Sequence, residues 1–444
     1  MTRNAMDLAL LAADDGQLLQ LLHQLPYLVT TTLATTQGTP VATAEPISRT
    51  APLPVSPPSR FDSARAVFSR FAFLRRLPGH NGEACVLECP LTAFRITLHQ
   101  PAAAALVAAL VTPRPVAEAS RLAGLSLPIG EALAALLADT GFLESDCVPP
   151  TDDLSAWEFH DLLFHSRSRL GAHDYFNTGS LRPPQGPPKP GLPRHQQRAE
   201  GASIDLLVPD WDTVLAHDPQ FSQVIEGRRT LRAYARTPLT IDQLGELLYR
   251  SARIRQLVPR NLQDIRSYET VDSPCPSAGA MGELDIHAVV MSCDGLEPGV
   301  YHYDAAAHQL HPHHSEPHDT TEAHAVLASA QQATGAKIDP QVLLLITSRL
   351  GRLAWKYRPN AYALTLKDVG VLYQTLYLTA TAMGLAPCAL GLGTIDSAGR
   401  ALGLNWTSTP VVGEFLIGSG LTGRPPTVSG FTDMVPWARA TRRR

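Results

Sequence analysis

The sequence WKYRPNAYALTLKDVGVLYQTLYLTATAMGLAPCALGLGTID, residues 355–396, decides the fold expected for the larger part of this 444-residue chain. Apolar residues between positions 366 and 383 recur at spacings of three and four: Leu366, Val369, Tyr373, Leu376, Tyr377, Ala380 and Met383. This spacing puts them on one face of an α-helix, so we predict a core helix. The stretch closes on a glycine-rich turn, Gly391-Leu392-Gly393, where a flat group or another backbone can approach closely.

Lysine is rare in this chain, and one lysine lies at the start of the same stretch. Lysine and arginine number 37 together, and only positions 189, 337, 356 and 367 are lysine, which leaves 37 − 4 = 33 arginines. Lysine can exchange a proton, whereas a guanidinium stays charged. The adjacent Lys356 and Tyr357 are therefore a candidate catalytic pair. The alternative is a surface lysine beside the end of a strand.

Composition excludes several classes of protein. The formal net charge of −4 gives no electrostatic reason to expect binding to nucleic acid or to an anionic membrane. No apolar run approaches the roughly 18 to 20 residues of a membrane span, and no signal peptide pattern is present, so we expect a cytoplasmic protein. Six scattered cysteines fit free thiols better than a disulfide framework: Cys85, Cys89, Cys147, Cys275, Cys293 and Cys388.

The first half of the chain is expected to hold a small α+β module. Residues 1–60 give no defined pattern, and the module spans residues 61–150. We predict strands followed by helices, at residues 71–74, 84–87, 94–98, 102–111, 116–123 and 128–138. Short strands, three helices and a wing-like end indicate a winged-helix-like fold. Such a module either binds a leader peptide along an exposed sheet edge or has a purely architectural role.

The second half is expected to be a separate domain. Residues 151–204 form a connecting segment that includes the proline-rich residues 181–190, and the domain follows at residues 205–440. We predict helices and strands at residues 241–254, 285–292, 299–303, 341–348, 366–383 and 411–417. These elements have no repeating βαβ order, so the fold class is α+β, with a mixed sheet flanked by helices.

Two kinds of candidate binding elements occur in this domain. The segment EGRRTLR, residues 226–232, brings together Arg228, Arg229, Thr230 and Arg232, whose guanidinium groups can pair with phosphate oxygens. The segment SPCPSAGA, residues 273–280, contains Ser277 and Gly279, which let backbone N–H groups approach a planar ring. An arginine cluster alone is more often a solvated surface, but together with two glycine-containing loops it indicates a cofactor site.

These motifs, in this order, resemble the flavin-dependent nitroreductase superfamily. RRTLR, PCPSAGA, GVYHYD, KYRPNAY, GLAPCALGLGTID and VVGEFLIGSGL carry the resemblance over residues 205–425. More narrowly the chain looks like the SagB/ThcOx-type branch, the azoline dehydrogenases of thiazole/oxazole-modified peptide and antibiotic biosynthesis. FHSRSR, residues 164–169, is similar to the segment before the catalytic domain of that branch. The resemblance implies a nitroreductase-like α+β fold with a winged-helix-like (PqqD/RRE-like) module before it.

The resemblance also implies an FMN cofactor and a set of site residues. Lys356 and Tyr357 match the catalytic Lys-Tyr pair of the branch. The cofactor-binding positions implied are Arg228, Arg229, Thr230, Arg232, Pro276, Ser277, Gly279, Gln374, Gly391, Leu392, Gly393 and Arg424. No metal site is implied. Ala363 and Val371 depart from the family pattern, where an arginine and a histidine are common, which bears on the substrate pocket more than on flavin binding.

The function implied is FMN-dependent oxidation of peptide azolines to azoles, with oxygen as final electron acceptor. The residues leave open whether a Tyr357 phenolate beside Lys356⁺ or a neutral Lys356 is the base. The alternatives are an NAD(P)H-dependent nitro- or ene-reductase of small molecules and a non-catalytic peptide-binding scaffold. The implied partners are an azoline-containing precursor peptide, a cyclodehydratase and a second copy of the chain, with FMN in a cleft of a homodimer.

Two other groups of residues invite a metal interpretation. Seven histidines crowd residues 302–324: His302, His308, His311, His313, His314, His318 and His324. Because HPHHSEPH lacks fixed ligand spacing, we predict a flexible insertion there rather than a metal site. Cys85 and Cys89, with His80 and His99 nearby, are interpreted as core thiols rather than as zinc ligands.

Overall fold

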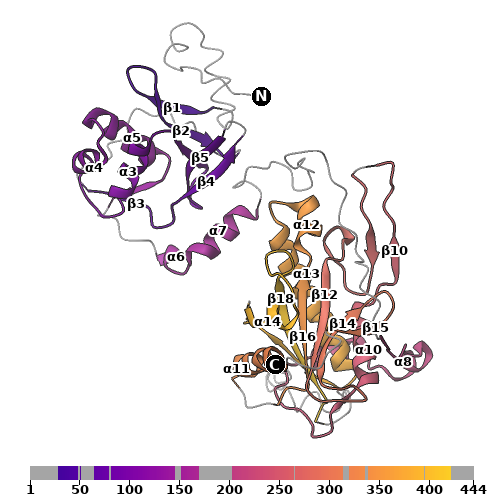
Figure 1. Cartoon of the computed structure of the whole chain (residues 1–444). Coiled ribbons are helices and arrows are strands. Elements are labelled where there is room, and N and C mark those ends of the chain that lie inside the picture. The colour runs from indigo at the N-terminus through magenta and orange to yellow at the C-terminus, as the bar shows by residue number, and fades with distance from the viewer. Residues whose placement is uncertain are drawn as a thin grey trace, which may run out of the picture. The chain divides into compact units, whose positions relative to one another are not determined.

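The computed structural model describes residues 29–48, 51, 65–79, 82–145, 152–169, 203–264, 266–313, 320–335, 339–394 and 396–421. The chain divides into two compact units, residues 1–178 and 179–444 (Figure 1). Each unit has its own hydrophobic core. The two units are therefore described separately.

The N-terminal unit is built on a five-stranded antiparallel sheet. Its strand order is β1-β2-β6-β5-β4, with bounds β1 Thr31–Ala34, β2 Pro40–Pro46, β4 Phe73–Gly79, β5 Gly82–Glu88 and β6 Phe94–Leu98. The last three strands confirm the sequence prediction. β1 and β2 come from residues 1–60, where no defined pattern was found, and Val41, Ala42 and Ala44 of β2 are buried in the same core.

Three helices complete the core of this unit. They are α3 Pro101–Ala109, α4 Val116–Ala123 and α5 Leu127–Asp139. Prolines near the first turns of α3 and α5 suit helix starts, and Gly124 ends α4 in a left-handed conformation at φ 69°. After α5 the chain forms β7 Leu143–Ser145, which pairs with β3 Ala66–Phe68. The three predicted helices are confirmed.

Two further helices, α6 Asp152–Ser155 and α7 Phe159–Arg167, pack on this unit. Leu162 is buried in its core, and the rings of Phe73 and Phe159 meet edge to face at 5.6 Å. The segment that resembles the family's FHSRSR motif is thus part of α7. The proline-rich residues 181–190 lie outside the described residues.

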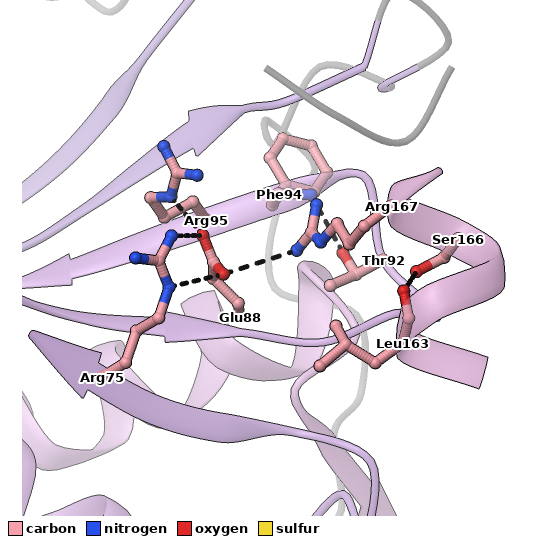
Figure 2. Close-up of polar contacts among 8 residues, drawn as sticks. All are labelled: Arg75, Glu88, Thr92, Phe94, Arg95, Leu163, Ser166 and Arg167. Atoms are coloured by element: carbon pink, nitrogen blue, oxygen red, sulfur yellow. Dashed lines mark hydrogen bonds and ion pairs between the residues drawn. The ribbon is translucent and has the colours of Figure 1, made fainter. Parts of the chain in front are cut away.

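A buried carboxylate connects α7 with the sheet. Figure 2 shows Glu88 of β5 among the guanidinium groups of Arg75, Arg95 and Arg167. Arg75 Nε and Arg95 Nε donate to the carboxylate at 2.9 and 2.6 Å, and Arg167 lies 3.8 Å away. Burial alone would raise the pKa of Glu88, but these three cations outweigh burial and lower it. The charge of this buried carboxylate is fully compensated, and we call the group of Glu88 with its arginines the compensated cluster.

The C-terminal unit contains a seven-stranded sheet in which every pairing is antiparallel. The strands in order across the sheet are β17 Ala386–Leu390, β18 Val411–Gly418, β16 Val342–Ser348, β12 Leu284–Val290, β14 Gly299–Asp304, β15 Gln309–Pro312 and β8 Ile204–Asp205. This topology confirms the predicted α+β class and excludes a doubly wound sheet. The prediction of a mixed sheet is wrong over the described residues, because every pair of neighbouring strands in this sheet is antiparallel.

Helices cover both faces of this sheet (Figure 1). α13 Ala361–Ala382 and α10 Ile241–Ala252 bury their apolar faces against one side, and α11 Thr320–Ala333 and α14 Asp396–Ala401 cover the other. β16 is buried along its whole length, which explains its continuous apolar run VLLLI. α13 is the predicted core helix, although Leu366 is 40% exposed and Leu372 takes a core position instead.

Smaller elements surround this core. They are α8 Trp211–His217, α9 Phe221–Gly227, α12 Leu350–Tyr357, the 3-10 turn η2 Ala278–Ala280, the β9–β13 pair at Leu239–Thr240 and Cys293–Asp294, and the hairpin of β10 Gln256–Val258 and β11 Thr270–Asp272. Lys356 and Tyr357 therefore lie in the last turn of a helix, so the alternative of a lysine beside a strand end is wrong.

The histidine-rich segment is not a flexible insertion over the part that the structure describes. His302 lies in β14 and His311 in β15, so residues 299–312 form a hairpin of the main sheet, and His324 lies in α11. Strand pairing and burial of the alternate residues overrode the polar composition. His314 and His318 lie outside the described residues.

The cysteine prediction is confirmed where it can be tested. Cys85, Cys89, Cys275, Cys293 and Cys388 are free thiols, and Cys147 lies outside the described residues. Cys89 is fully buried in the N-terminal core and Cys85 packs against it. Among the described residues no single helix has the length and apolarity of a membrane span; α4 and α5 meet that criterion only when taken together as a sharply bent pair.

Candidate functional site

Lys356 and Tyr357 lie in a cluster with Tyr268, from the turn of the β10–β11 hairpin, and Gly279, from the loop before β12. Lys356 Nζ donates to the Tyr268 hydroxyl at 2.6 Å and lies 5.0 Å from the ring centre of Tyr357. Tyr268 Oη in turn donates to the carbonyl of Gly279 at 3.1 Å. A Cβ atom on Gly279 would lie only 2.7 Å from Tyr357 Oη, and the φ of this residue is +60°. Only glycine fits this position.

A buried arginine of α12 forms hydrogen bonds to the β10–β11 hairpin and to the loop before β12. Arg352 is fully buried one helical turn before Lys356, and its guanidinium donates to the carbonyls of Met281 and Glu269, each at 2.6 Å. Met281 and Leu353 form a small apolar cluster around it. Because residues i and i+4 share one face of a helix, the Arg352 contacts also fix the place of Lys356.

The ammonium of Lys356 is held in its charged form. Burial alone would lower the pKa of this lysine, but hydrogen bonds to the hydroxyls of Tyr268 and Tyr357 outweigh burial and raise it. A lysine with a raised pKa is a poor proton acceptor at neutral pH. Of the two bases that the sequence left open, the geometry favours a phenol.

The loop that carries Pro276, Ser277 and Gly279 rests on the N-terminal half of α13. The Asp368 carboxylate of α13 accepts the backbone N–H of Ala278 at 2.8 Å. Ser277 Oγ accepts the backbone N–H of Gly282 at 2.9 Å, which closes the turn. Burial raises the pKa of Asp368 despite this hydrogen bond. The three predicted residues therefore lie on one turn, next to Lys356 and Tyr357.

Arg228, Arg229, Thr230 and Arg232 lie near the other end of α13, just after α9. Thr230 Oγ1 is 2.9 Å from the Tyr377 hydroxyl, and the Arg228 guanidinium lies 5.3 Å from the Tyr377 ring centre. Arg232 hydrogen-bonds the Cys388 thiol, whose pKa burial raises even so. In the described part of the chain no carboxylate forms an ion pair with Arg228 or Arg232. Their charge is free to hold an anion.

Gly391, Leu392 and Gly393 form an exposed loop after β17, over a buried carboxyl group. A Cβ on Gly393 would lie 2.5 Å from Glu414 Oε1, and the backbone N–H of Thr394 donates to the same oxygen at 3.3 Å. Glu414 Oε2 has no hydrogen-bond partner among the described residues. Burial raises the pKa of Glu414 to about 7. Leu392 is 76% exposed, so the outer side of the loop is open to a ligand.

The predicted residues thus form two groups, joined by α13. Asp368 supports one group and Tyr377 the other, nine residues apart, which is about 13 Å along a helix. Gln374 is exposed on α13 between them. Arg424 lies outside the described residues. One chain does not bring all the predicted positions to a single point.

A pocket of about 540 Å³, counted with its open mouth, lies beside the first group. Pro276 and Ser277 line it together with Cys275, Tyr303 and Leu372. Burial raises the pKa of the Cys275 thiol to about 11, so this cysteine is a neutral thiol at physiological pH. The lining is mainly apolar.

Histidines meet elsewhere, on the main sheet. His287 Nδ1 lies 2.7 Å from His313 Nε2, and His287 Nε2 lies 3.0 Å from Thr347 Oγ1. The rings of His287 and His302 lie 5.2 Å apart on paired strands. No group of His, Cys, Asp or Glu side chains within the described ranges has an arrangement that would hold a metal ion.

Sequence reasoning missed four residues that shape these groups: Tyr268, Arg352, Tyr377 and Glu414. Tyr377 was assigned only to the apolar face of its helix, yet its hydroxyl also accepts the backbone N–H of Ala389 at 2.8 Å. Tyr268 lies 88 positions from Lys356 and belongs to no motif. Glu414 was visible as a charged residue inside a strand-forming run, and that signal marks a buried carboxyl.

Two family models match the chain. The model described as "Cyanobactin oxidase ThcOx" matches residues 66–174, and the model described as "Nitroreductase family" matches residues 225–418. The first match covers most of the described N-terminal unit, including α6 and α7. The second covers both groups of predicted site residues except Arg424.

The chain is also similar to individual proteins. A protein of Methanocaldococcus jannaschii with a provisional nitroreductase name is 27% identical over 191 residues, which is 43% of this chain and 85% of that protein. A provisionally named nitroreductase structure from Ralstonia eutropha is 18% identical with a TM-score of 0.38, over 53% of this chain and 98% of that one.

Two further solved structures are similar to a comparable degree. A provisionally named nitroreductase structure from Anabaena variabilis is 20% identical with a TM-score of 0.36 over 50% of this chain, and the match spans 39% of that chain's length. The E. coli microcin synthetase McbBCD complex with truncated pro-MccB17 bound matches at 19% identity and a TM-score of 0.36, over 43% of this chain and 69% of that one.

An antiparallel sheet covered by helices on both faces, with the two family matches along the chain, defines an oxidoreductase of the nitroreductase type. The match to the cyanobactin oxidase model, which precedes the nitroreductase match in the chain, indicates a smaller group within these oxidoreductases. A ThcOx match over residues 66–174 followed by a nitroreductase match over residues 225–418 is the domain order implied by the resemblance to the SagB/ThcOx-type branch.

Proposed function

We propose that this chain is an FMN-dependent dehydrogenase that oxidises azoline rings of a modified peptide to azoles. The observation that carries the proposal is the Lys356–Tyr357 pair, held with Tyr268 against Gly279 on the predicted cofactor-facing loop. A cyanobactin-oxidase module before a nitroreductase domain supports the substrate class. The precursor peptide and a cyclodehydratase that forms the azolines are the partners we propose, in the cytoplasm.

The residues present fit FMN. Arg228 and Arg232 have no carboxylate partner among the described residues, which suits a phosphate. Pro276 and Ser277 line a mainly apolar pocket, and the Gly391–Gly393 loop is open on its outer side, which suits close approach of a ring. When bound, FMN would supply the hydride acceptor. Arg228, Thr230 and Arg232 would hold its phosphate end.

The chain's own residues would supply orientation and the base. Oxidation of an azoline removes a proton from one ring carbon and a hydride from its neighbour. This C–H group is already acidic, since its carbon lies between a C=N bond and a carbonyl group. Tyr357 Oη beside the Lys356 ammonium would take this proton, because a nearby cation favours the phenolate form.

We further propose that two copies of the chain pair. The two groups of site residues lie about 13 Å apart along α13, and pairing would let the groups of two chains face each other. Large apolar side chains of the two helices that precede the arginine group in the chain are exposed, notably Leu215 of α8 at 75% and Phe221 of α9 at 68%. Leu366 and Val371 of α13 are also exposed. Sedimentation of the flavin-loaded protein at micromolar concentration should give a dimer, and a flavin-loaded monomer would contradict the pairing.

The experiment that tests the function separates an oxidase from a reductase. The purified protein should be yellow with an FMN spectrum, and it should oxidise a thiazoline-containing peptide without NAD(P)H while consuming oxygen. Turnover only with NAD(P)H and a nitro or alkene substrate would establish the reductase alternative. A colourless protein that binds the peptide without turnover would establish the scaffold alternative.

A further inference from the structure

We propose that Tyr268 is a positioning residue for the proton step: its hydroxyl fixes the Lys356 ammonium, which leaves Tyr357 Oη as the atom that takes the substrate proton. This inference rests on the proposed function. In the step, the C–H bond of the azoline breaks and an O–H bond forms on Tyr357. The electron pair goes into the ring as the hydride of the neighbouring carbon leaves to the flavin oxidant.

The Tyr268 hydroxyl takes part in two hydrogen bonds, and the donor of each can be identified. An ammonium has three donors and no acceptor, so Lys356 Nζ donates to Tyr268 Oη across their 2.6 Å contact. The single hydroxyl proton of Tyr268 then points to the carbonyl of Gly279 at 3.1 Å. The hydroxyl of Tyr268 thus accepts one hydrogen bond and donates another. The proton of Tyr268 is therefore committed to the Gly279 carbonyl in this arrangement.

Tyr357 is placed differently. Its hydroxyl lies against Gly279, where a Cβ would be 2.7 Å away, and it hydrogen-bonds Lys356. No backbone carbonyl of the described residues accepts its proton. Tyr357 thus has the cation beside it without a fixed acceptor for its own proton, as a proton-accepting phenol requires. Of the two phenols beside Lys356, only Tyr357 is free to exchange its proton with a substrate.

The ring of Tyr268 is also held rigidly enough to act as a support. It packs edge to face on Trp355 at 5.8 Å, and the Lys356 ammonium lies 4.6 Å from its centre. The next residue, Glu269, accepts a hydrogen bond from buried Arg352 through its carbonyl. Tyr268 therefore connects the β10–β11 hairpin to the end of α12, with Lys356 between them.

The test compares Tyr268→Phe with Tyr357→Phe, and Tyr301→Phe is the matched control. Tyr301 donates to the carbonyl of Glu297 at 2.8 Å, so the control also loses one bond from a phenol to a carbonyl, away from Lys356. Thiazoline oxidation is measured from pH 6 to 10, approximately, with kcat and KM separated and flavin content recorded. Phenolate absorbance of the same proteins is titrated without substrate.

Tyr268→Phe should lower kcat by about 10-fold at neutral pH with KM and flavin content unchanged, and activity should recover at higher pH. The reason is that a loosened ammonium favours the phenolate less, so the base ionises only at higher pH. Tyr357→Phe should stay inactive at every pH and lose the phenolate signal that appears earliest in the titration. Tyr301→Phe should keep the wild-type profile.

The inference is overturned if Tyr268→Phe keeps the wild-type pH profile, or if it removes the earliest phenolate signal while Tyr357→Phe retains it. A wild-type protein that oxidises no azoline would instead refute the proposed function. The phenolate titration does not depend on turnover, so it still decides the arrangement of Tyr268, Lys356 and Tyr357 in that case.

Discussion

Two arginine groups of this chain have opposite surroundings. Arg75, Arg95 and Arg167 surround the buried carboxylate of Glu88 in the N-terminal unit (Figure 2). Arg228 and Arg232 have no carboxylate partner among the described residues. The comparison teaches that arginine clustering by itself says nothing about function. A compensated cluster stabilises a fold, whereas an uncompensated one has charge left for a ligand.

The largest effect on folding should come from removing the counter-ion of the compensated cluster. Glu88→Gln leaves Arg95, whose side chain is only 8% exposed, without its carboxylate. Breaking a buried ion cluster in this way should destabilise the N-terminal unit by about 3 to 5 kcal/mol. Hydrogen exchange of β5 and β6 would measure the loss, and Glu144→Gln, at an exposed position of β7, is the control. Unchanged exchange in Glu88→Gln would mean that the comparison does not hold.

The next largest effect is expected at Glu414, a buried carboxyl that forms no ion pair with any cation in the described part of the chain. Its pKa of about 7, raised by burial, lies above the 4.5 of the ordinary group. Between these values the folded chain holds a proton that the unfolded chain releases, so the free energy of unfolding falls as pH rises through this range. Glu414→Gln should remove about 3 kcal/mol of this fall. Urea unfolding at pH 5 and pH 8, with exposed Glu297→Gln as control, tests it; parallel curves for Glu414→Gln and wild type would disprove it.

The uncompensated cluster should affect the ligand and not the fold. Arg228→Ala or Arg232→Ala should weaken FMN binding by about 1.5 to 3 kcal/mol each, the worth of one charge-assisted hydrogen bond. The free energy of unfolding of the flavin-free protein should hardly change. Flavin fluorescence titration measures the affinity, and Arg236→Ala on the neighbouring exposed position is the control. Full flavin occupancy in the double variant would refute the phosphate assignment.

Local sequence was sufficient for the long regular elements. The spacing of Val369, Leu376 and Ala380 predicts α13 because burial of one helix face repeats with the helical period. β17 was missed because its five residues, APCAL, contain a proline and begin two positions after Gly384, both typical of a turn. The strand forms there because it pairs with β18 over its full length.

Contacts between distant residues limited the prediction of the site. Lys356 and Tyr357 are part of a sequence motif, but Tyr268 is not. Tyr268 contacts Lys356 because Arg352 binds α12 to the carbonyls of Met281 and Glu269, which lie 71 and 83 positions earlier in the chain. No local pattern encodes such a meeting. The same reason separates the predicted cofactor residues into two groups, since α13 positions one group at each half of its length.

The central claim is that Tyr357 and Lys356 move the substrate proton. The most direct test is turnover of a thiazoline peptide by Tyr357→Phe, which keeps the ring against Gly279 and removes only the hydroxyl. We predict a fall in kcat of about 10² to 10⁴ with the FMN spectrum, the fold and KM retained. Near-full oxidation by Tyr357→Phe, with flavin bound at the wild-type level, would contradict the account.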